Sequence, residues 1–504
     1  MVQIDVLIVG AGPTGLALAL WLTSLGVKVR IVDKTDAPGT TSRALAIQAR
    51  TLELYRQFDL TDEVLDQGHK VPAANLWVRG KRQTRVSFAD FAGDITPYGP
   101  FIFPQDQHEE LLIRRLEKIG VAVERKTELV SYRQDGDGVM AELRAISGQL
   151  ETVATRYLAG CDGARSTIRQ AMGAGFPGGT YQHIFYVADV EASGPAMDGE
   201  LHADLDEADF LAVFPMKGQG KARLVGTVRD EREHGDQLKF ADVSDRAIRN
   251  MKLEVTKVNW FSTYQVHHRV TDHFRDRRVF LLGDAAHIHS PAGGQGMNTG
   301  LGDAINLAWK LSAVIAGKAA DKLLETYELE RMPFARTLVA TTDRAFTLAT
   351  AEGRIADFVR TRLVPAVMPT LFKFAAARKF MFRAISQATI EYRDSPLSRG
   401  AAGSIKGGDR LPWAPVPGAD NFDSLREPRW QIHIYGTVRQ DVSAWCDSHD
   451  IPLHQYAWHA KHAAAGFAKD ALYLIRPDAY VALADPRQAS ASLDHYLAEQ
   501  QISV

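Results

Sequence analysis

The chain has 504 residues, of which 45% are hydrophobic and 24% are charged, as in ordinary globular proteins. Its 59 Lys and Arg against 61 Asp and Glu give a net charge of −2, which argues against a nucleic-acid partner. Cys161 and Cys446 are the only cysteines, so a disulfide framework or a four-thiolate metal site is excluded. With no secretory signal and no apolar stretch approaching about 18 residues, we expect a cytoplasmic protein of roughly two to four domains that does not enter a membrane.

The predicted elements begin with a strand–helix–strand unit. Residues 4–9 form an apolar strand, residues 15–25 have a helical pattern, and residues 27–33 form a second strand. This order within about 30 residues predicts a βαβ unit with a parallel sheet. A helical pattern at 107–119 then precedes an alternating stretch that turns at DGDG, residues 135–138, which is typical of a hairpin.

The second half of the chain changes rhythm twice. Residues 181–269 contain several strand patterns, and a strand then runs into the glycine-rich stretch 283–300. A long helical region follows at 298–387. Gly, Pro, Asp and Ser then accumulate around 388–425, which indicates a linker, and the last 80 or so residues alternate strands with helices.

The glycine turn after the first strand has the pattern of a dinucleotide site. Gly10, Gly12 and Gly15 form G-x-G-x-x-G directly between a strand and a helix. The first glycine makes the tight turn, the second lets the backbone approach a pyrophosphate, and the third lets the helix lie close to the strand. The positive end of that helix faces the phosphates. Asp33 ends the next strand, where its carboxylate can accept hydrogen bonds from a ribose.

Three sets of residues resemble the FAD-dependent aromatic hydroxylases, single-component flavoprotein monooxygenases with the p-hydroxybenzoate hydroxylase fold. The sets are GAGPTG with Asp33, CDGARS at 161–166, and GDAAH at 283–287, which continues as SPAGGQGMNTGLGDAINLAWKL. They occur in the family's order, and the agreement spans roughly residues 3–395. The long third block is the most specific of the three. The end of the chain resembles the thioredoxin-like domain that the phenol and polyketide hydroxylase branch carries.

The resemblance implies an α/β fold in which a sheet-rich substrate domain is inserted into a Rossmann-like FAD-binding domain. A working redox domain needs a C-x-x-C pair, whereas Cys446 stands alone, so we expect the C-terminal domain to be structural or to support a dimer. The expected boundaries are 1–175 and 270–390 for the FAD-binding domain with its helical region 298–390, 176–269 for the substrate domain, 391–425 for the linker and 426–504 for the thioredoxin-like domain.

In the family, a set of turns and one helix N-terminus hold FAD. The resemblance places the diphosphate beside Arg43 and the ribityl chain beside Asp284. It also places the backbone N–H groups of Met297 and Asn298 at the N1–C2=O edge of the flavin, where a helix N-terminus would stabilise the anionic reduced form. The complete implied set is Gly10, Gly12, Pro13, Thr14, Gly15, Asp33, Lys34, Arg43, Gln105, Asp162, Arg165, Gly283, Asp284, Pro291, Gly294, Gly296, Met297 and Asn298.

The resemblance also suggests where a substrate would lie. Pro291 matches the family proline at the reactive face of the flavin, and the strand with His267 and His268 flanks the cavity. A histidine there could orient or deprotonate a phenol, because it titrates near neutral pH; the competing interpretation is a plain strand histidine. Leu45 stands where the phenol hydroxylases have a presumed aspartate base. We therefore predict catalytic roles for Pro291, His267 and Tyr264, and substrate contacts for Tyr181, Phe214, Pro215 and Tyr264.

The reaction that the resemblance implies is hydroxylation of a small aromatic, phenolic compound through a C4a-hydroperoxyflavin, with NADPH or NADH and O₂ as co-substrates. Two alternatives stay open: epoxidation, Baeyer–Villiger insertion or antibiotic modification by the same cofactor, and a non-catalytic flavin-binding scaffold. We predict no metal, because His287 and His289 have no carboxylate or cysteine cluster beside them in the sequence. The sequence does not choose between NADH and NADPH, and the family makes a homodimer possible.

Overall fold

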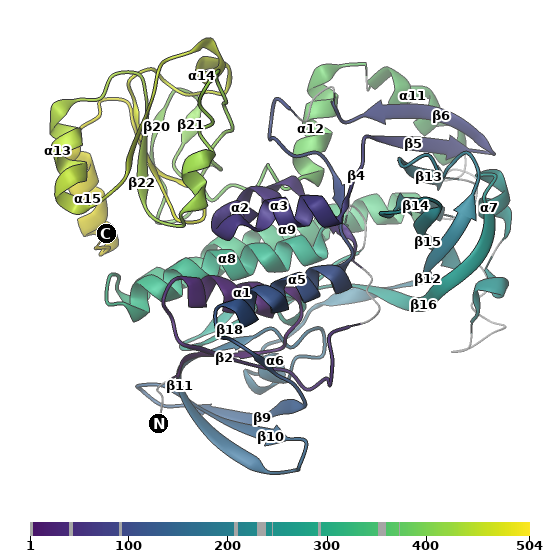
Figure 1. Ribbon diagram of the computed structural model, residues 1–504, viewed down its shortest axis with the longest axis horizontal. Coiled ribbons are helices and arrows are strands. Elements are labelled where there is room, and N and C mark those ends of the chain that lie inside the picture. The colour runs from purple at the N-terminus through teal and green to yellow at the C-terminus, as the bar shows by residue number, and fades with distance from the viewer. Residues whose placement is uncertain are drawn as a thin grey trace.

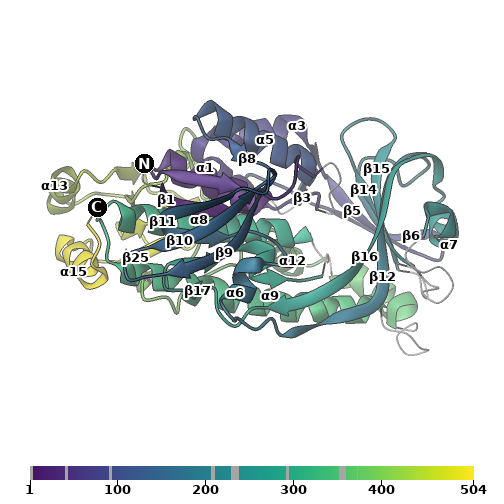
Figure 2. The same ribbon diagram turned by 90° about the horizontal axis from the view of Figure 1, so that it is seen from below.

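In the computed structural model, the chain forms two eight-stranded sheets, a six-stranded sheet and a small three-stranded sheet (Figure 1). The second and third sheets lie at opposite ends of the molecule in Figure 1, and Figure 2 shows the first sheet between them. The structure describes residues 4–39, 44–89, 93–205, 210–228, 238–243, 245–290, 294–350, 359–371 and 373–503.

The first sheet confirms the βαβ unit. Its main path is β17–β18–β11–β1–β2–β8, with β1 parallel to both neighbours, and β9 and β10 form the predicted hairpin. Helix α1 is apolar on nearly all sides because it packs between this sheet and helices α5 and α8. The strands are β1 (Ile4–Val9), β2 (Val29–Val32), β8 (Val123–Glu124), β9 (Thr127–Gln134), β10 (Val139–Ala145), β11 (Leu150–Gly160), β17 (Arg275–Asp276) and β18 (Val279–Leu281).

The second sheet, in the order β19–β16–β12–β15–β14–β13–β5–β6, forms the wall seen at one end of Figure 2. Its outer face buries an apolar cluster that includes residues of the α7 segment. The strands β5 and β6 join it from residues 73–87, well before the predicted range 176–269. The strands are β5 (Ala73–Val78), β6 (Lys81–Ser87), β12 (Gly178–Ser193), β13 (Leu201–Leu205), β14 (Phe210–Pro215), β15 (Lys221–Val228), β16 (Glu254–Val270) and β19 (His287–Ile288).

The third sheet belongs to the C-terminal part and has the order β21–β20–β25–β24–β22–β23. It mixes parallel and antiparallel pairs and packs helices α13 and α15 at its side, as expected for the predicted thioredoxin-like unit. The strands β20 and β21 come from the stretch predicted as a linker. The bounds are β20 (Arg399–Ala402), β21 (Ile405–Lys406), β22 (Gln431–Tyr435), β23 (Leu453–Tyr456), β24 (Leu472–Ile475) and β25 (Val481–Asp485).

The helices lie mostly between the sheets, and α8 and α9 cross the centre of Figure 1. Among the described residues, no helix combines the length and the hydropathy needed to cross a bilayer. The small sheet consists of β3 (Ala46–Ile47), β4 (His69–Lys70) and β7 (Phe101–Ile102). The α-helices are α1 (Pro13–Ser24), α2 (Ala49–Tyr55), α3 (Leu60–Gln67), α5 (Gln105–Lys118), α6 (Thr167–Ala171), α7 (Asp245–Asn250), α8 (Gly296–Ile315), α9 (Glu325–Thr350), α11 (Val364–Leu371), α12 (Ala375–Ile385), α13 (Gln440–His449), α14 (Ala460–Ala464) and α15 (Ser490–Gln500).

Candidate active site

The three glycines of the turn between β1 and α1 have two different roles. A Cβ on Gly10, whose φ is +104°, would lie 2.2 Å from the carbonyl oxygen of Cys161, and one on Gly15 would lie 1.9 Å from that of Gly10. A Cβ on Gly12 would meet no atom within 4 Å. Gly10 and Gly15 are therefore required by the protein's own packing, whereas Gly12 leaves open space at the N-terminus of α1, where Pro13 is the first helical residue. That space suits a phosphate group.

The carboxylate of Asp33 lies beside this turn. Its Oδ2 accepts a hydrogen bond from the Ala11 N–H at 2.6 Å, and its Oδ1 accepts one from the Thr35 N–H at 2.8 Å. The Thr35 hydroxyl also donates to Oδ1, at 2.6 Å, so of the roughly four acceptor positions of the carboxylate one is left for a ribose hydroxyl. The neighbouring Lys34 is exposed.

A second turn follows β11 and contains the CDGARS motif. The Oδ2 of Asp162 accepts hydrogen bonds from the N–H groups of Thr167 and Ile168, at 2.8 and 3.2 Å, and so caps the short helix α6. Its Oδ1 is buried and has no hydrogen-bond partner among the described residues. Arg165 is exposed in the same turn. One buried acceptor is thus left for a ligand.

The third turn, at Gly283, is held by a buried carboxylate. Asp303 of α8 accepts hydrogen bonds from the Gly283 N–H at 3.0 Å and from Arg331 at 2.7 Å, and its Oδ2 lies 2.7 Å from His287 Nε2. Burial alone would raise the pKa of the Asp303 carboxyl, but Arg331 and His287 outweigh it, so the pKa lies below its ordinary value. Asp284, predicted to bind the ribityl chain, is exposed at this turn.

Thr14 joins the first and third turns. Its hydroxyl oxygen would lie 2.6 Å from a Cβ on Gly283 and 2.2 Å from a Cβ on Gly300 of α8. Only glycine fits at both positions, so α8 crosses directly over the start of α1. The two predicted FAD-binding turns are consequently neighbours in space.

The N-terminus of α8 carries the predicted flavin-binding residues Gly294, Gly296, Met297 and Asn298. An α-helix leaves its first N–H groups without an internal partner, so the amides of 296–298 are available to an acceptor. The Asn298 side chain is not: its Oδ1 accepts from the Gln48 N–H and the Thr51 hydroxyl, both at 2.8 Å. Its Nδ2 donates to the Ala46 and Gly294 carbonyls, both at 2.9 Å. The side chain fixes the turn and leaves the backbone to bind.

Two buried polar atoms lie just before this turn. His289 Nδ1 lies 2.8 Å from the Ser290 carbonyl oxygen, which fixes the proton on Nδ1, while the buried Nε2 has no partner among the described residues. The Ser290 hydroxyl is also buried and without a partner there. His289 Nε2 would lie 3.5 Å from a Cβ on Gly296, so it flanks the N-terminus of α8. Burial lowers the pKa of His289 to about 4, which keeps the ring neutral.

We expect His289→Gln to flatten the loss of stability in acid. Between pH 6.5 and about 4, the unfolded chain binds a proton at His289 that the folded protein does not, so stability falls as the pH falls. At pH 5 this loss is at most about 2 kcal/mol. Urea unfolding at pH 7.5 and pH 5 measures it, with the exposed His495→Gln as control. Equal pH dependence in both variants and in the wild type would contradict the burial of the His289 imidazole.

Gln105 lies at the start of α5, where its side-chain Nε2 donates to Glu109 at 2.8 Å and its N–H donates to the Ala44 carbonyl at 3.1 Å. Burial raises the pKa of Glu109. The predicted residues Arg43 and Pro291 lie outside the described residues. Apart from these two, the predicted FAD-binding residues lie in six segments: the turns at residues 10–15, 33–34, 162–165 and 283–284 and the starts of α5 and α8.

These segments fit FAD. Gly12 leaves open space at a helix N-terminus, which suits a diphosphate. Asp33 suits the ribose. The free amides of α8, the buried Nε2 of His289 and the buried hydroxyl of Ser290 suit the polar edge of a flavin ring. In the described part of the chain, no three His, Cys, Asp or Glu side chains are grouped to hold a metal ion.

The inner face of the second sheet lies against this region. Phe214 of β14 and Leu201 of β13 pack with Leu45 and with Phe382 of α12, next to the segment that binds Asn298. On the same face, Tyr264 is paired with Phe185, and both pack with Tyr181, Phe210 and Val266. The aromatic side chains of Phe214, Phe210, Phe185, Tyr181 and Tyr264 thus form an aromatic wall along β14, β12 and β16. This wall begins near the turn at 294–298, which we call the flavin turn.

The structure separates some of the predicted substrate residues. Side chains alternate across a strand, so Pro215 lies on the opposite face from Phe214, and His267 on the opposite face from Tyr264. His267 Nδ1 instead lies 2.7 Å from the Thr180 hydroxyl. Thus the predicted catalytic histidine does not share a face with Tyr264; its neighbour His268 does.

Three polar side chains complete the aromatic wall. The Tyr181 hydroxyl donates to the carboxylate of Asp343 on α9, and His268 Nδ1 lies 3.7 Å from the same carboxylate. The His268 ring meets that of Tyr181 edge-on at 4.8 Å. Burial and the Asp343 carboxylate raise the pKa of Tyr181, so its hydroxyl stays protonated and donates.

Sequence reasoning missed Asp303, Arg331 and Asp343. Asp303 lies within the quoted motif block, but nothing in the sequence indicates that it reaches back to Gly283. Arg331 and Asp343 lie on a long helix in which charged residues are common. Burial distinguishes Arg331, which is 1% exposed, whereas only its contacts with Tyr181 and His268 distinguish Asp343.

Comparisons with known proteins agree with this site. A family model described as an FAD binding domain matches residues 3–342. The 6-methylpretetramide 4-monooxygenase of Streptomyces rimosus is 32% identical over 524 residues, covering 97% of this chain and 92% of that protein. The rifampicin monooxygenase of Rhodococcus hoagii is 32% identical over 492 residues and 96% of each chain. The solved structure of the OxyS anhydrotetracycline hydroxylase from Streptomyces rimosus is 28% identical, with a TM-score of 0.78 over 99% of both chains.

The family model covers the glycine turns, the N-terminus of α8 and the second sheet. The relatives that match nearly the whole chain also include its C-terminal unit. The open space at Gly12 and the buried polar atoms without partners among the described residues lie in the segments where the motifs predict FAD to bind. This chain therefore belongs to the family defined by that FAD-binding domain and is a flavin-dependent monooxygenase.

Proposed function

We propose that this monooxygenase hydroxylates a fused-ring phenol of the polyketide class, with FAD, O₂ and NADPH or NADH. The observation that carries the proposal is the aromatic wall set against the flavin turn, which suits a flat, apolar substrate. Relatives named for tetracycline intermediates and for rifampicin support a substrate of this size. The reaction balances if NAD(P)H supplies two electrons, one oxygen atom enters the ring and the other leaves as water.

The chain's own residues would bind FAD, orient the substrate against it and exclude water from the site. The Gly12 turn and the α1 N-terminus would hold the diphosphate, Asp33 the ribose, and the α8 amides the flavin edge. FAD, when bound, supplies the electron transfer and the oxygen activation. Leu45 is buried in the wall, at the position where the phenol hydroxylases have a presumed base. Because its side chain is aliphatic, it cannot accept the phenol's proton. The Tyr181–His268–Asp343 group is the polar part of the wall, and we assign it to the phenolic hydroxyl.

Tyr264→Ala tests the wall. Loss of one aromatic contact is expected to raise the KM for the aromatic substrate by about tenfold, with little change in kcat, because the contact is made equally before and during the reaction. Phe261→Ala, on the opposite face of the same strand, is the matched control and should leave KM unchanged. If the two variants behave alike, Tyr264 is not part of the substrate wall.

The function itself is tested by following NADPH and NADH oxidation in air while peroxide is counted. Polyketide-like phenols, simple phenols, salicylates and naphthols form the panel. The proposal predicts that a fused-ring phenol speeds nicotinamide oxidation severalfold with little peroxide. Oxidation that rises only together with peroxide identifies a compound that fills the site without being hydroxylated. If simple phenols are hydroxylated and fused-ring compounds are not, the polyketide assignment is wrong.

The named rifampicin relatives favour one alternative, in which the same flavin site modifies an antibiotic by hydroxylation, epoxidation or oxygen insertion. Adding rifampicin and anhydrotetracycline to the panel distinguishes this from a biosynthetic role. We also propose, from the family resemblance, a homodimer in the cytoplasm. Light scattering on a size-exclusion column tests the dimer: twice the mass of one chain supports it, and the mass of a single chain contradicts it.

A further inference from the structure

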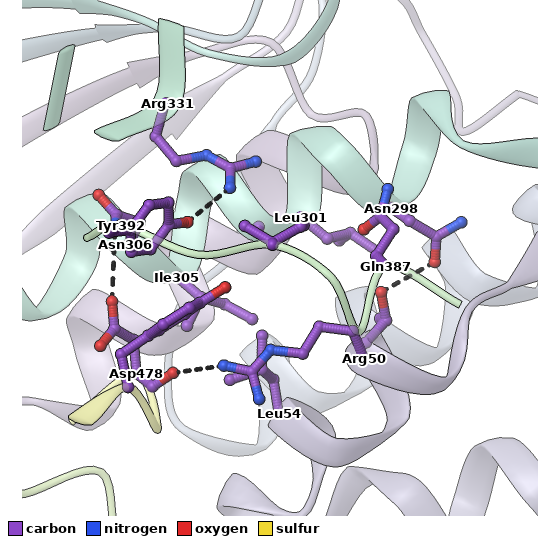
Figure 3. Close-up of a pocket in the computed structure, with 14 residues that line it drawn as sticks. Arg50, Leu54, Asn298, Leu301, Ile305, Asn306, Arg331, Gln387, Tyr392 and Asp478 are labelled. Atoms are coloured by element: carbon purple, nitrogen blue, oxygen red, sulfur yellow. Dashed lines mark hydrogen bonds between the residues drawn. The ribbon is translucent and has the colours of Figure 1, made fainter. Parts of the chain in front are cut away.

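Buried charges join the C-terminal unit to the flavin region. The turn between β24 and β25, residues 476–480, enters between α2, α8 and α9 (Figure 3). Its Arg476 forms two hydrogen bonds with Glu330 of α9, at 2.7 and 2.9 Å, and Lys310 of α8 contacts Glu330 at 2.7 Å. All three side chains are fully buried. Such groups are stable in a protein interior only when every partner is in place, so the turn has one defined position.

One route leads from this turn to the start of α8. Arg50, in the first turn of α2, donates to the Asp478 carbonyl at 2.7 Å, and its guanidinium lies 4.8 Å from the centre of the Tyr480 ring. Gln48 and Thr51, which flank Arg50 in the chain, both donate to the Asn298 side chain. Asn298 in turn holds the Gly294 carbonyl, as described above. Tyr480 is thus connected, through α2, to the turn at the start of α8 that carries the predicted flavin-binding amides.

A second route leads from the same tyrosine to the Gly283 turn. The Tyr480 ring packs on the Tyr392 ring with 4.4 Å between their centres. The Tyr392 hydroxyl accepts a hydrogen bond from Arg331 at 2.7 Å, and Arg331 holds Asp303. Asp303 accepts from the Gly283 N–H. Both turns that border the flavin site are thus tied to one ring of the C-terminal unit.

The two routes face a common cavity of about 20 Å³, which has room for a single water molecule. Figure 3 shows Arg331 and Tyr392 at the upper left, Asn298 and Arg50 at the right, and Asp478 at the lower left, where a dashed line joins it to Arg50. Side chains around so small a cavity have little room to move. Shortening Tyr480 would enlarge it and release Arg50 and Tyr392 together.

We propose that Tyr480 of the C-terminal unit is a positioning residue for the FAD site: it fixes Arg50 and Tyr392, and through them the turns at Gly294–Asn298 and Gly283. This gives the C-terminal unit, which has no C-x-x-C pair, a role in positioning the FAD site. The inference rests on the FAD site of the proposed function.

The test is the affinity of the full-length protein for FAD, measured by flavin fluorescence, together with the absorbance spectrum of the bound flavin. Tyr480→Ala is expected to weaken FAD binding by about tenfold and to shift the flavin bands. Tyr480→Phe keeps the ring that contacts Arg50 and Tyr392 and should bind FAD within about twofold of the wild type. If the alanine variant does not fold, Tyr480→Leu takes its place with the same expectation.

Tyr456→Ala is the matched control. Tyr456 lies in the same unit, is 9% exposed and stacks on Tyr435 with 5.1 Å between ring centres, away from residues 476–480. Its loss should lower the melting temperature without changing the FAD affinity or the spectrum. If the Tyr480 variants bind FAD as the wild type does, or if Tyr456→Ala weakens FAD binding equally, Tyr480 is only structural and the proposal is overturned. If the wild type itself binds no FAD, the proposed function fails instead.

Discussion

Gly12→Val is expected to weaken FAD binding by about 100-fold while leaving the protein folded. No atom lies within 4 Å of a Cβ at Gly12, so the apoprotein can accommodate the side chain. Its cost to apoprotein stability should not exceed about 1 kcal/mol, the usual penalty for valine at a helix N-cap. A diphosphate can no longer approach, and losing even one charge-assisted hydrogen bond costs about 1.5–3 kcal/mol, so FAD should bind about 100-fold more weakly.

Gly10→Ala gives the contrasting result, because its Cβ would lie 2.2 Å from the Cys161 carbonyl oxygen at a φ of +104°. It should destabilise the apoprotein by on the order of 4 kcal/mol, through backbone strain rather than through the ligand. Thermal unfolding of both apoproteins and fluorescence titration with FAD separate the two effects. If Gly12→Val binds FAD normally, the space at the α1 N-terminus is not the diphosphate site.

Asp303→Asn is expected to be the most destabilising of the conservative changes, at about 3–5 kcal/mol. The substitution leaves the Arg331 guanidinium buried without its counter-charge; Arg331 is 1% exposed. It also weakens the hydrogen bond that holds the Gly283 N–H, so the FAD affinity should fall as well. Urea unfolding measures the first effect and FAD titration the second.

Asp321→Asn is the control for this change. Asp321 pairs with Arg275 at the surface, where its side chain is 58% exposed, and such pairs contribute at most about 1 kcal/mol. Equal losses of stability in the two variants would mean that the Asp303–Arg331 pair is screened by water and does not hold the Gly283 turn.

The local parts of the fold were predictable from the sequence. The strand at 4–9, the glycine turn and Asp33 lie close together in the chain, so their spacing alone defines the βαβ unit. The hairpin at 135–138 is equally local, and its Asp135 accepts from the Gly138 N–H at 2.9 Å. By contrast, β5 pairs in parallel with β13 across more than 100 residues, and no periodicity in either strand indicates that partner.

The candidate site divides in the same way. The turns with Gly10, Asp162 and Gly283 follow from motifs, but the contacts that hold them do not: Gln48 meets Asn298 across 250 residues of sequence. The prediction for His267 depended on strand register. Alternation shows that His267 and His268 lie on opposite faces of the sheet. Because the pairing of β12 with β16 shifts register between Thr180 and Ile184, the sequence alone does not show which of the two histidines lies on the inner face.

The central claim, that this protein is a monooxygenase, is tested most directly by turnover under isotopically labelled O₂. The purified, FAD-loaded protein is supplied with NADPH or NADH and the best compound of the panel, and the product is weighed by mass spectrometry. A monooxygenase should place one labelled oxygen atom in each hydroxylated product, and the nicotinamide consumed should equal the product formed. Oxygen taken from water, or nicotinamide oxidation that yields only peroxide for every compound of the panel, would contradict it.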